Sequence, residues 1–150
     1  MNLFHYKISG THHGKVLIFK HMDIPDEQFA KIIAEAMDEL PEKYIRALDN
    51  VAVVYEDDPT PEQRELMKLR NNQTLFGLYQ GIPQTARGSG YNLVLPDKIT
   101  IFKHPLMFAS RDTAELKANV KHTLWHEIAH HFGLDHDRIH ELEDNHKKGE

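Results

Sequence analysis

The sequence predicts an α+β fold, in which a small mixed β-sheet packs with one long helix and flanking helices. Two observations predict it. Apolar residues recur at helical spacing over residues 26–40 and 113–132. Between these stretches lie short runs that are rich in β-branched and aromatic residues and bounded by turn-forming residues, at 51–55, 74–79 and 97–102. We therefore expect helices at both ends of the chain and strands between them.

The helix over residues 26–40 is predicted by one apolar face and ends where Pro41 follows it. That face consists of Phe29, Ile32, Ile33, Ala36, Met37 and Leu40. Residues 51–55 are typical of a buried strand, and a short helix is expected over 62–70. Residues 81–96 contain much Gly, Pro and Ser and predict a long loop. Because long loops in small domains often carry function, we expect this loop to form part of a cleft.

The last third of the chain predicts the clearest helix. Asp112 can cap its start, and Glu115, three residues later, would complete a capping box. The helix is expected to run over residues 113–132 and to end at Gly133, which allows a left-handed turn. A second short helix is expected over 137–145.

Size and composition favour one soluble globular domain. The chain has 150 residues, of which 40% are hydrophobic and 27% charged. No apolar run approaches the roughly 20 residues that a membrane helix needs. The first residues lack the pattern of a secretory signal, so we expect a cytoplasmic protein with no membrane partner. The net charge of −5 argues against a nucleic-acid partner.

Histidine and cysteine usage narrow the metal chemistry. The chain has 12 histidines and no cysteine. Disulfides and thiolate ligands are therefore excluded, and any metal ion must be held by His and carboxylate side chains.

The residues that carry chemistry lie in the stretch HEIAHHFGLDH, which starts at His126. His126 and His130 are one helical turn apart, so both imidazoles can reach one metal ion. Glu127 adjoins the first ligand and is placed to take a proton from a water molecule that the metal activates. A turn at Gly133 would bring His136 back as the third ligand.

Three histidines and one open position are typical of a catalytic Zn²⁺ site. Other third ligands remain open: Asp135 is the main rival, and Glu141 and Glu143 are weaker ones. His131 points away from the first two histidines, and a role in packing around the site is favoured for it.

The same stretch resembles the extended zinc motif HExxHxxGxxH of the metzincins. The wider chain, from about Met22 to His136, is similar to a bacterial family of minimal zincin-like metallopeptidases. The segments DELPEKY, VAVVYEDDP, LFGLYQGIPQTARGSGY and LPDKITIFKHPL carry this similarity in order. Residues 1–21 lie before it as an N-terminal extension with a hairpin pattern, and residues 22–150 form the expected metallopeptidase domain.

The resemblance implies a minimal zincin-like fold with an active-site helix. It implies His126, His130 and His136 as zinc ligands, Glu127 as the general base, and a peptide or protein substrate. In such folds an edge strand beside the cleft can bind an extended peptide, and residues 98–102 are the candidate. The chain has no methionine after Met107, so it lacks the methionine turn of full metzincins.

The predicted function is therefore zinc-dependent hydrolysis of peptide bonds. Arg87, Tyr91 and His104 are candidates for stabilising the oxyanion. One alternative is a zinc-binding or interaction module without catalysis. Another is a metal-dependent endoribonuclease, because a ribosomal-RNA maturation family uses three histidines at the same spacing; that family usually has a small residue at the position of Glu127.

Overall fold

The computed structural model describes residues 22–92, 94–135 and 137–139. The N-terminal extension, His136 and most of the helix predicted over 137–145 lie outside these residues. The described elements, in chain order, are α1 (Asp26–Glu39), α2 (Glu42–Arg46), β1 (Val51–Glu56), α3 (Pro61–Leu66), β2 (Gly77–Gln80), the 3₁₀ helix η1 (Gln84–Ala86), β3 (Asp97–Phe102), α4 (Lys103–Phe108) and α5 (Thr113–His131).

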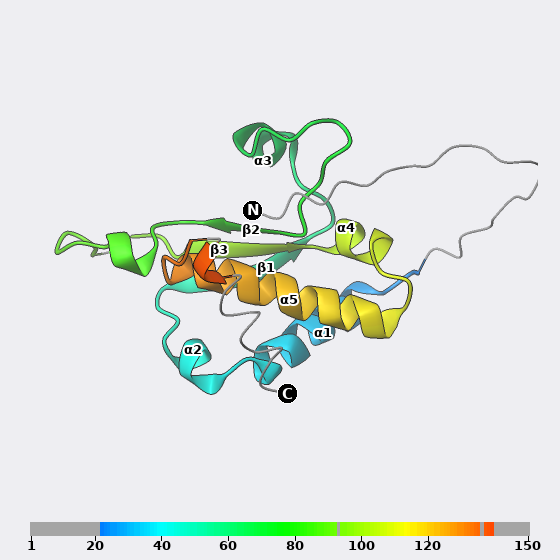
Figure 1. The fold of residues 1–150 in the computed structure, drawn as a ribbon, viewed down its shortest axis with the longest axis horizontal. Helices are drawn as coiled ribbons and strands as arrows, with labels where there is room; N and C mark the ends of the chain where they lie inside the picture. The colour runs from blue at the N-terminus through cyan, green and yellow to red at the C-terminus, as the bar shows by residue number, and fades with distance from the viewer. Residues whose placement is uncertain (1–21, 93, 136, 140–150) are drawn as a thin grey trace, which may run out of the picture.

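The sheet is mixed, as predicted. In the described part of the chain it has three strands in the order β1-β3-β2. β1 runs parallel to β3, with Val51 opposite Asp97, and β2 runs antiparallel to β3, with Gly77 opposite Ile101. α1 and α5 lie on one face of this sheet and α3 lies on the other (Figure 1). The α+β fold class is thereby confirmed.

β3 is the central strand, which corrects an expectation from the sequence. Residues 98–102 were expected to form an edge that could accept a substrate strand. Both sides of β3 are instead paired with β1 and β2, so its backbone groups are already used. Among the described strands, β2 and β1 are the edges.

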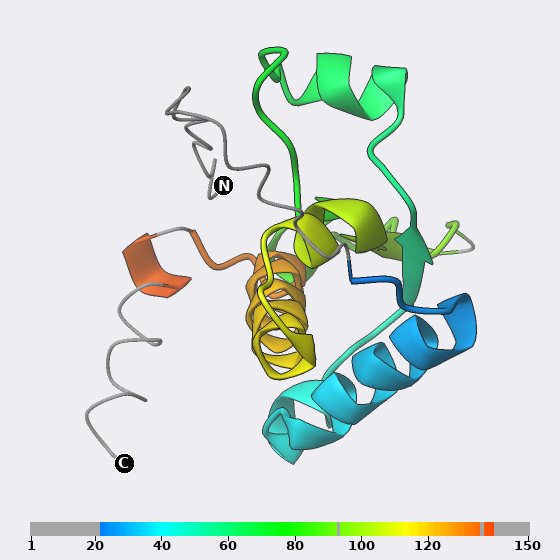
Figure 2. The same ribbon diagram turned by 90° about the vertical axis from the view of Figure 1, so that its right-hand side faces the viewer.

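The main core lies between the sheet and the helices on its α1/α5 face. α5 packs against α1, β2 and β3, and Figure 2 views α5 almost end-on, with α1 beside it on the same side of the sheet. Ile99 and Ile101 of β3 join this core, whereas Phe102 joins a smaller cluster on the opposite face with Leu75 and Leu78. Ile101 and Phe102 point to opposite faces of the sheet because successive side chains of a strand alternate between its two faces.

Two lysines that interrupt the apolar pattern of α5 have partners on α1. Lys117 Nζ lies 2.9 Å from a Glu35 carboxylate oxygen, and Lys121 Nζ lies 2.9 Å from one of Glu39. Both pairs lie at the rim of the α1–α5 contact, where long side chains keep their charged ends in water.

Three local expectations were wrong in detail. β1 is mostly half-buried, because it is an edge strand and not an interior one. α3 ends at Leu66, since Lys68 adopts a left-handed conformation with φ 52°. Glu115 does not complete a capping box: its carboxylate accepts a hydrogen bond from the Arg111 backbone N–H at 2.7 Å.

Among the described residues, no helix is long and apolar enough to cross a membrane.

Asp112 caps α5 by accepting a hydrogen bond from the Glu115 backbone N–H at 2.8 Å. We predict that Asp112→Ala lowers the free energy of unfolding by about 1 kcal/mol, because that N–H loses its partner. Urea unfolding measures this loss. Asp112→Asn retains an acceptor oxygen and should lose clearly less; equal losses for the two variants would contradict the capping role.

Candidate metal centre

The two histidines and the glutamate of the motif lie together on α5. His126 and Glu127 are buried, and His130, one turn after His126, is half-buried. The ring centroids of His126 and His130 are 4.9 Å apart, with the rings at 83° to each other. Helical spacing has therefore brought the two imidazoles side by side, as the sequence predicted.

These side chains line a cleft of about 510 Å³. α5 contributes one side of it, and β2 with the residues just before it contributes the other. Its lining residues are Met67, Leu75, Phe76, Gly77, Leu78, Tyr79, Pro83, His122, Thr123, His126, Glu127, His130, Gly133, Leu134 and Asp135.

Strand β2 approaches α5 most closely at Gly77. A Cβ atom at this position would lie 2.7 Å from Thr123 Cγ2 and 2.9 Å from Glu127 Cγ. No side chain fits there unless the side chains of Thr123 and Glu127, or the backbone that carries them, shift. Glycine therefore allows the strand to lie directly against the proposed base.

Glu127 is oriented by the backbone of β2. Its carboxylate accepts a hydrogen bond from the Tyr79 backbone. Burial raises the pKa of Glu127 to about 7, and the Tyr79 hydrogen bond counteracts part of that rise. A carboxylate with a pKa near neutrality can both accept and return a proton.

The two described histidines supply nitrogen donors of the kind that zinc binds. Two imidazoles lie one helical turn apart at the cleft, and burial lowers the pKa of His130, which favours the neutral ring that metal ions bind. Within the described ranges, no group of three or more His, Asp or Glu side chains could hold a metal ion. The expected third ligand, His136, lies outside these ranges, and its role stays a prediction.

The chain leaves α5 through a left-handed turn. Gly133 has φ 78°, and a Cβ atom there would overlap Thr85 Oγ1. The rival ligand Asp135 lines the cleft, but its Oδ1 accepts a hydrogen bond from the Arg138 backbone N–H at 2.9 Å. Asp135 thus caps the helical residues that follow.

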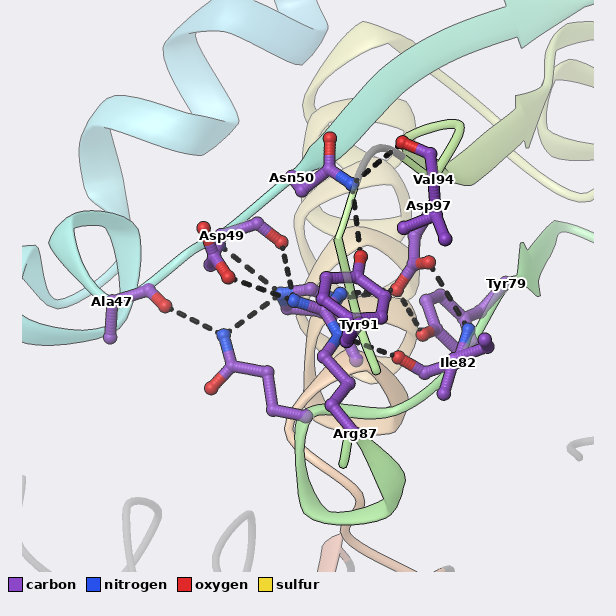
Figure 3. Close-up of polar contacts among 11 residues, drawn as sticks. Ala47, Asp49, Asn50, Tyr79, Ile82, Arg87, Tyr91, Val94 and Asp97 are labelled. Atoms are coloured by element: carbon purple, nitrogen blue, oxygen red, sulfur yellow. Dashed lines mark hydrogen bonds and ion pairs between the residues drawn. The ribbon is translucent and has the colours of Figure 1, made fainter. Parts of the chain in front are cut away.

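A buried carboxylate holds the end of α5 that carries His130. Asp97, at the start of β3, is 3% exposed. Its oxygens accept hydrogen bonds from Tyr79 Oη at 2.5 Å, Arg87 Nη2 at 2.7 Å and the Ile82 backbone N–H at 3.1 Å (Figure 3). His131 Nδ1 lies 3.2 Å from the same carboxylate. We refer to Asp97, Tyr79, Arg87 and His131 as the Asp97 network.

His131 is fully buried in this network, which confirms the packing role favoured from the sequence. The Asp49 backbone N–H donates to its Nε2 at 3.3 Å, and Gln84 Nε2 lies 3.1 Å from the same atom. With Nε2 accepting, Nδ1 carries the hydrogen that points to Asp97. The ring is therefore neutral, in keeping with burial, which lowers the pKa of His131.

Asp97 remains ionised because its partners outweigh its burial. Burial alone would raise the pKa, but hydrogen bonds from Tyr79, Ile82, Arg87 and His131 hold the pKa of Asp97 below its usual value. A carboxylate with a lowered folded-state pKa stabilises the fold above its unfolded pKa of about 3.9, and that stabilisation is lost as the pH falls through the folded value.

The three residues expected to stabilise an oxyanion are not among the residues that line the cleft. Arg87 points into the Asp97 network, and its guanidinium stacks over the ring of Tyr91 at 4.2 Å. Tyr91 Oη accepts a hydrogen bond from Asn50 Nδ2 at 2.9 Å. His104 lies 2.7 Å from Asp58 at the other end of the sheet. That expectation was wrong.

The loop at 81–96 contributes less to the cleft than expected. Of its described residues, only Pro83 lines the cleft. Arg87 instead binds the Ile82 carbonyl and both carboxylates, Asp49 and Asp97. The loop thus supports the end of α5 from outside the cleft.

Helical spacing places Thr123 in the same sector as His126, Glu127 and His130, and Thr123 does line the cleft; sequence reasoning missed His122, which also lines it. Helical spacing could also have placed His122, four residues before His126, since residues four apart share a face. Sequence reasoning also missed Met67, for which no local pattern gave a signal.

Two adjacent histidines and a buried glutamate lie along a cleft beside a strand, an arrangement of side chains that metal-dependent hydrolases use. Comparison with known families agrees. The model of the zincin-like metallopeptidase family matches residues 48–146, about two thirds of the chain. The chain belongs to this family of zincin-like metallopeptidases, which implies the use of zinc at the level of the family. A comparison with curated proteins found no match. The family match begins at Leu48, so α1 lies before the matched range.

We predict that Gly133→Ala lowers the free energy of unfolding by about 1–2 kcal/mol and weakens zinc binding. The added Cβ meets Thr85, and a non-glycine residue is strained at φ 78°. Urea unfolding and competition with a chromogenic zinc chelator measure the two effects. Gly88→Ala is the control, because a Cβ atom there meets nothing within 4 Å. Equal unfolding free energies and equal zinc affinities of the two variants would contradict a requirement for glycine at this turn.

We also predict that Asp97→Asn costs about 3 kcal/mol of unfolding free energy at pH 7, because it removes a buried charge that holds Arg87. Asp49→Asn is the matched control: Asp49 contacts the same guanidinium at 2.9 Å, but its side chain is 72% exposed, and it should cost below about 1 kcal/mol. The difference in unfolding free energy between the wild type and Asp97→Asn should decrease as the pH falls below about 4, because Asp97 becomes protonated in the wild type. A gap that is constant with pH would contradict an ionised Asp97.

Proposed function

We propose that this protein is a zinc-dependent peptidase that cleaves peptide or protein substrates, with Glu127 as the general base. The observation that carries this proposal is the meeting of His126, His130 and the Glu127 carboxylate in one cleft along the edge of β2. The family match supports peptidase chemistry at the level of the family.

His126 and His130 would hold the zinc ion from α5, and His136 would supply the third nitrogen from the turn after Gly133. When bound, zinc supplies a Lewis acid that polarises the scissile carbonyl and makes a water molecule more acidic.

Glu127 handles the proton. Its carboxylate takes a proton from the attacking water and passes it to the leaving amine. The Tyr79 backbone N–H holds the carboxylate in place, and burial keeps competing water away from it. Both features favour one fixed orientation of the base relative to the two histidines.

The outer edge of β2 supplies the surface for an extended substrate, in place of residues 98–102. The Phe102 N–H donates to the Phe76 carbonyl at 2.8 Å. By the antiparallel register, the backbone groups of Gly77 and Tyr79 therefore point away from β3, toward the cleft. Tyr79 uses its N–H on Glu127, which leaves the Gly77 backbone and the Tyr79 carbonyl to pair with a peptide.

The cleft favours a peptide over RNA. None of the lining residues that the structure describes is Lys or Arg, whereas a phosphate backbone is bound by cationic side chains. Glu127 also supplies a base at the position where the endoribonuclease family usually has a small residue.

We predict that Glu127→Gln lowers the rate of peptide cleavage at least 100-fold while zinc remains bound at one ion per chain. Glutamine retains an oxygen that can accept from the Tyr79 N–H, so α5 and β2 should stay in place. Cleavage of casein and of a peptide library measures the rate, and elemental analysis measures zinc.

Wild-type protein and His126→Ala are the controls, and His126→Ala should lose both zinc and activity. Cleavage that survives in Glu127→Gln would refute the role of Glu127. Stoichiometric zinc without cleavage of any peptide by the wild type would favour the non-catalytic module.

A further inference from the structure

We propose that Met67, Leu75 and Leu78 form a subsite that selects a large apolar side chain of the substrate peptide, next to the bond that is cleaved. We call these three residues the apolar wall. The inference rests on the proposed peptidase function, since it assigns the specificity of the same cleft.

The apolar wall lies across the cleft from the metal-binding side chains. Leu75 and Leu78 are buried and pack with Phe102 on the sheet face opposite α5, and Met67 packs against them while partly exposed. His126, Glu127 and His130 come from α5 on the other face. The apolar wall and these three α5 residues line the same cleft. The edge of β2 lies between the two groups.

This arrangement separates the side chains of a bound peptide. A strand paired with the edge of β2 directs successive side chains alternately to the two faces of the sheet. One set of side chains then points toward α5, and the other set points toward the apolar wall. A residue whose side chain meets the wall must therefore sit beside the residue that faces the metal centre.

The wall is held in shape by the segment between α3 and β2. Arg64 Nη2 donates to the Arg70 carbonyl at 3.0 Å, and the Arg70 N–H donates to Gln73 Oε1 at 2.9 Å. Gln73 is 8% exposed. These bonds close the segment on itself, so the wall does not have to become ordered when a peptide binds.

The charges along the cleft favour an apolar side chain at the wall. Among the described lining residues, the acidic side chains are Glu127 on α5 and Asp135 just after it, and the wall itself carries none. A charged substrate side chain would lose water there without gaining a partner. Replacing a large apolar side chain by alanine should lower kcat/KM about tenfold to 100-fold.

Zinc-loaded protein incubated with an equimolar library of ten-residue peptides tests this directly. Mass spectrometry identifies the cleaved bonds. We expect Leu, Ile, Met or Phe to be enriched at least tenfold over Ala, Ser and Asp at one position that flanks the cleaved bond. Cleavage with no such enrichment overturns the subsite while the peptidase function stands.

Met67→Lys and Leu66→Lys form a matched pair that assigns the preference to the wall. Both place a lysine at the end of α3, but Leu66 is 64% exposed and is not among the residues that line the cleft. Met67→Lys should lower kcat/KM at least tenfold for a peptide with Leu at the selected position. Leu66→Lys should stay within twofold of wild type, and equal effects of the two variants overturn the assignment.

Met67→Ala gives a second readout, because it shortens the side chain without adding charge. It should shift the preference from Leu toward Phe and Trp. An unchanged ranking of side chains in Met67→Ala counts against the wall as the determinant.

A binding measurement separates the subsite from catalysis. Fluorescence anisotropy of labelled peptides on zinc-loaded Glu127→Gln should show at least tenfold tighter binding of the Leu peptide than of its Asp analogue. If this preference appears while the wild type cleaves nothing, the subsite stands and the peptidase function fails. If the two peptides bind equally, the subsite is refuted whatever the cleavage result.

Discussion

The buried carboxylate of Asp97 fixes the part of the fold on which the cleft depends. A charge that is 3% exposed must be surrounded by donors, and Asp97 draws them from β2, the loop after it and the end of α5. Tyr79 joins this network to the proposed base: its hydroxyl donates to Asp97, and its backbone N–H binds Glu127. His131 connects the Asp97 network to the end of α5, because its ring contacts Asp97 and the residue directly follows His130. One ionised group therefore connects the strand beside the cleft to the helix that carries His126 and His130.

Two glycines at close backbone approaches line the cleft. Gly77 lets β2 lie against Thr123 and Glu127 on α5, and Gly133 lets the chain turn beside Thr85 at the end of the same helix. Between these points the edge of β2 faces the cleft instead of another described strand. The proposed site for an extended peptide thus lies where glycine allows the close approaches, and the proposed apolar wall lies on the opposite face of the sheet.

Features of local origin could be predicted from the sequence, and features of long-range origin could not. The spacing of His126 and His130 and the left-handed turn at Gly133 are properties of a few consecutive residues, and the structure agrees with them. The three strands were also predicted, but their order was not, because pairing joins segments tens of residues apart. Pro96 and Pro105 flank β3 as they would flank an edge strand, although it lies in the centre. Arg87 was expected at the cleft because it lies in the loop at 81–96, but its guanidinium pairs with Asp97, and no pattern in the sequence indicates that contact.

The central claim is that one zinc ion is held by three histidines of the motif. X-ray absorption spectroscopy at the zinc edge counts imidazole ligands and tests this claim most directly. We expect three imidazoles per zinc in the wild-type protein and two in His136→Ala. Two imidazoles in the wild type, or a spectrum that His136→Ala leaves unchanged, would contradict it.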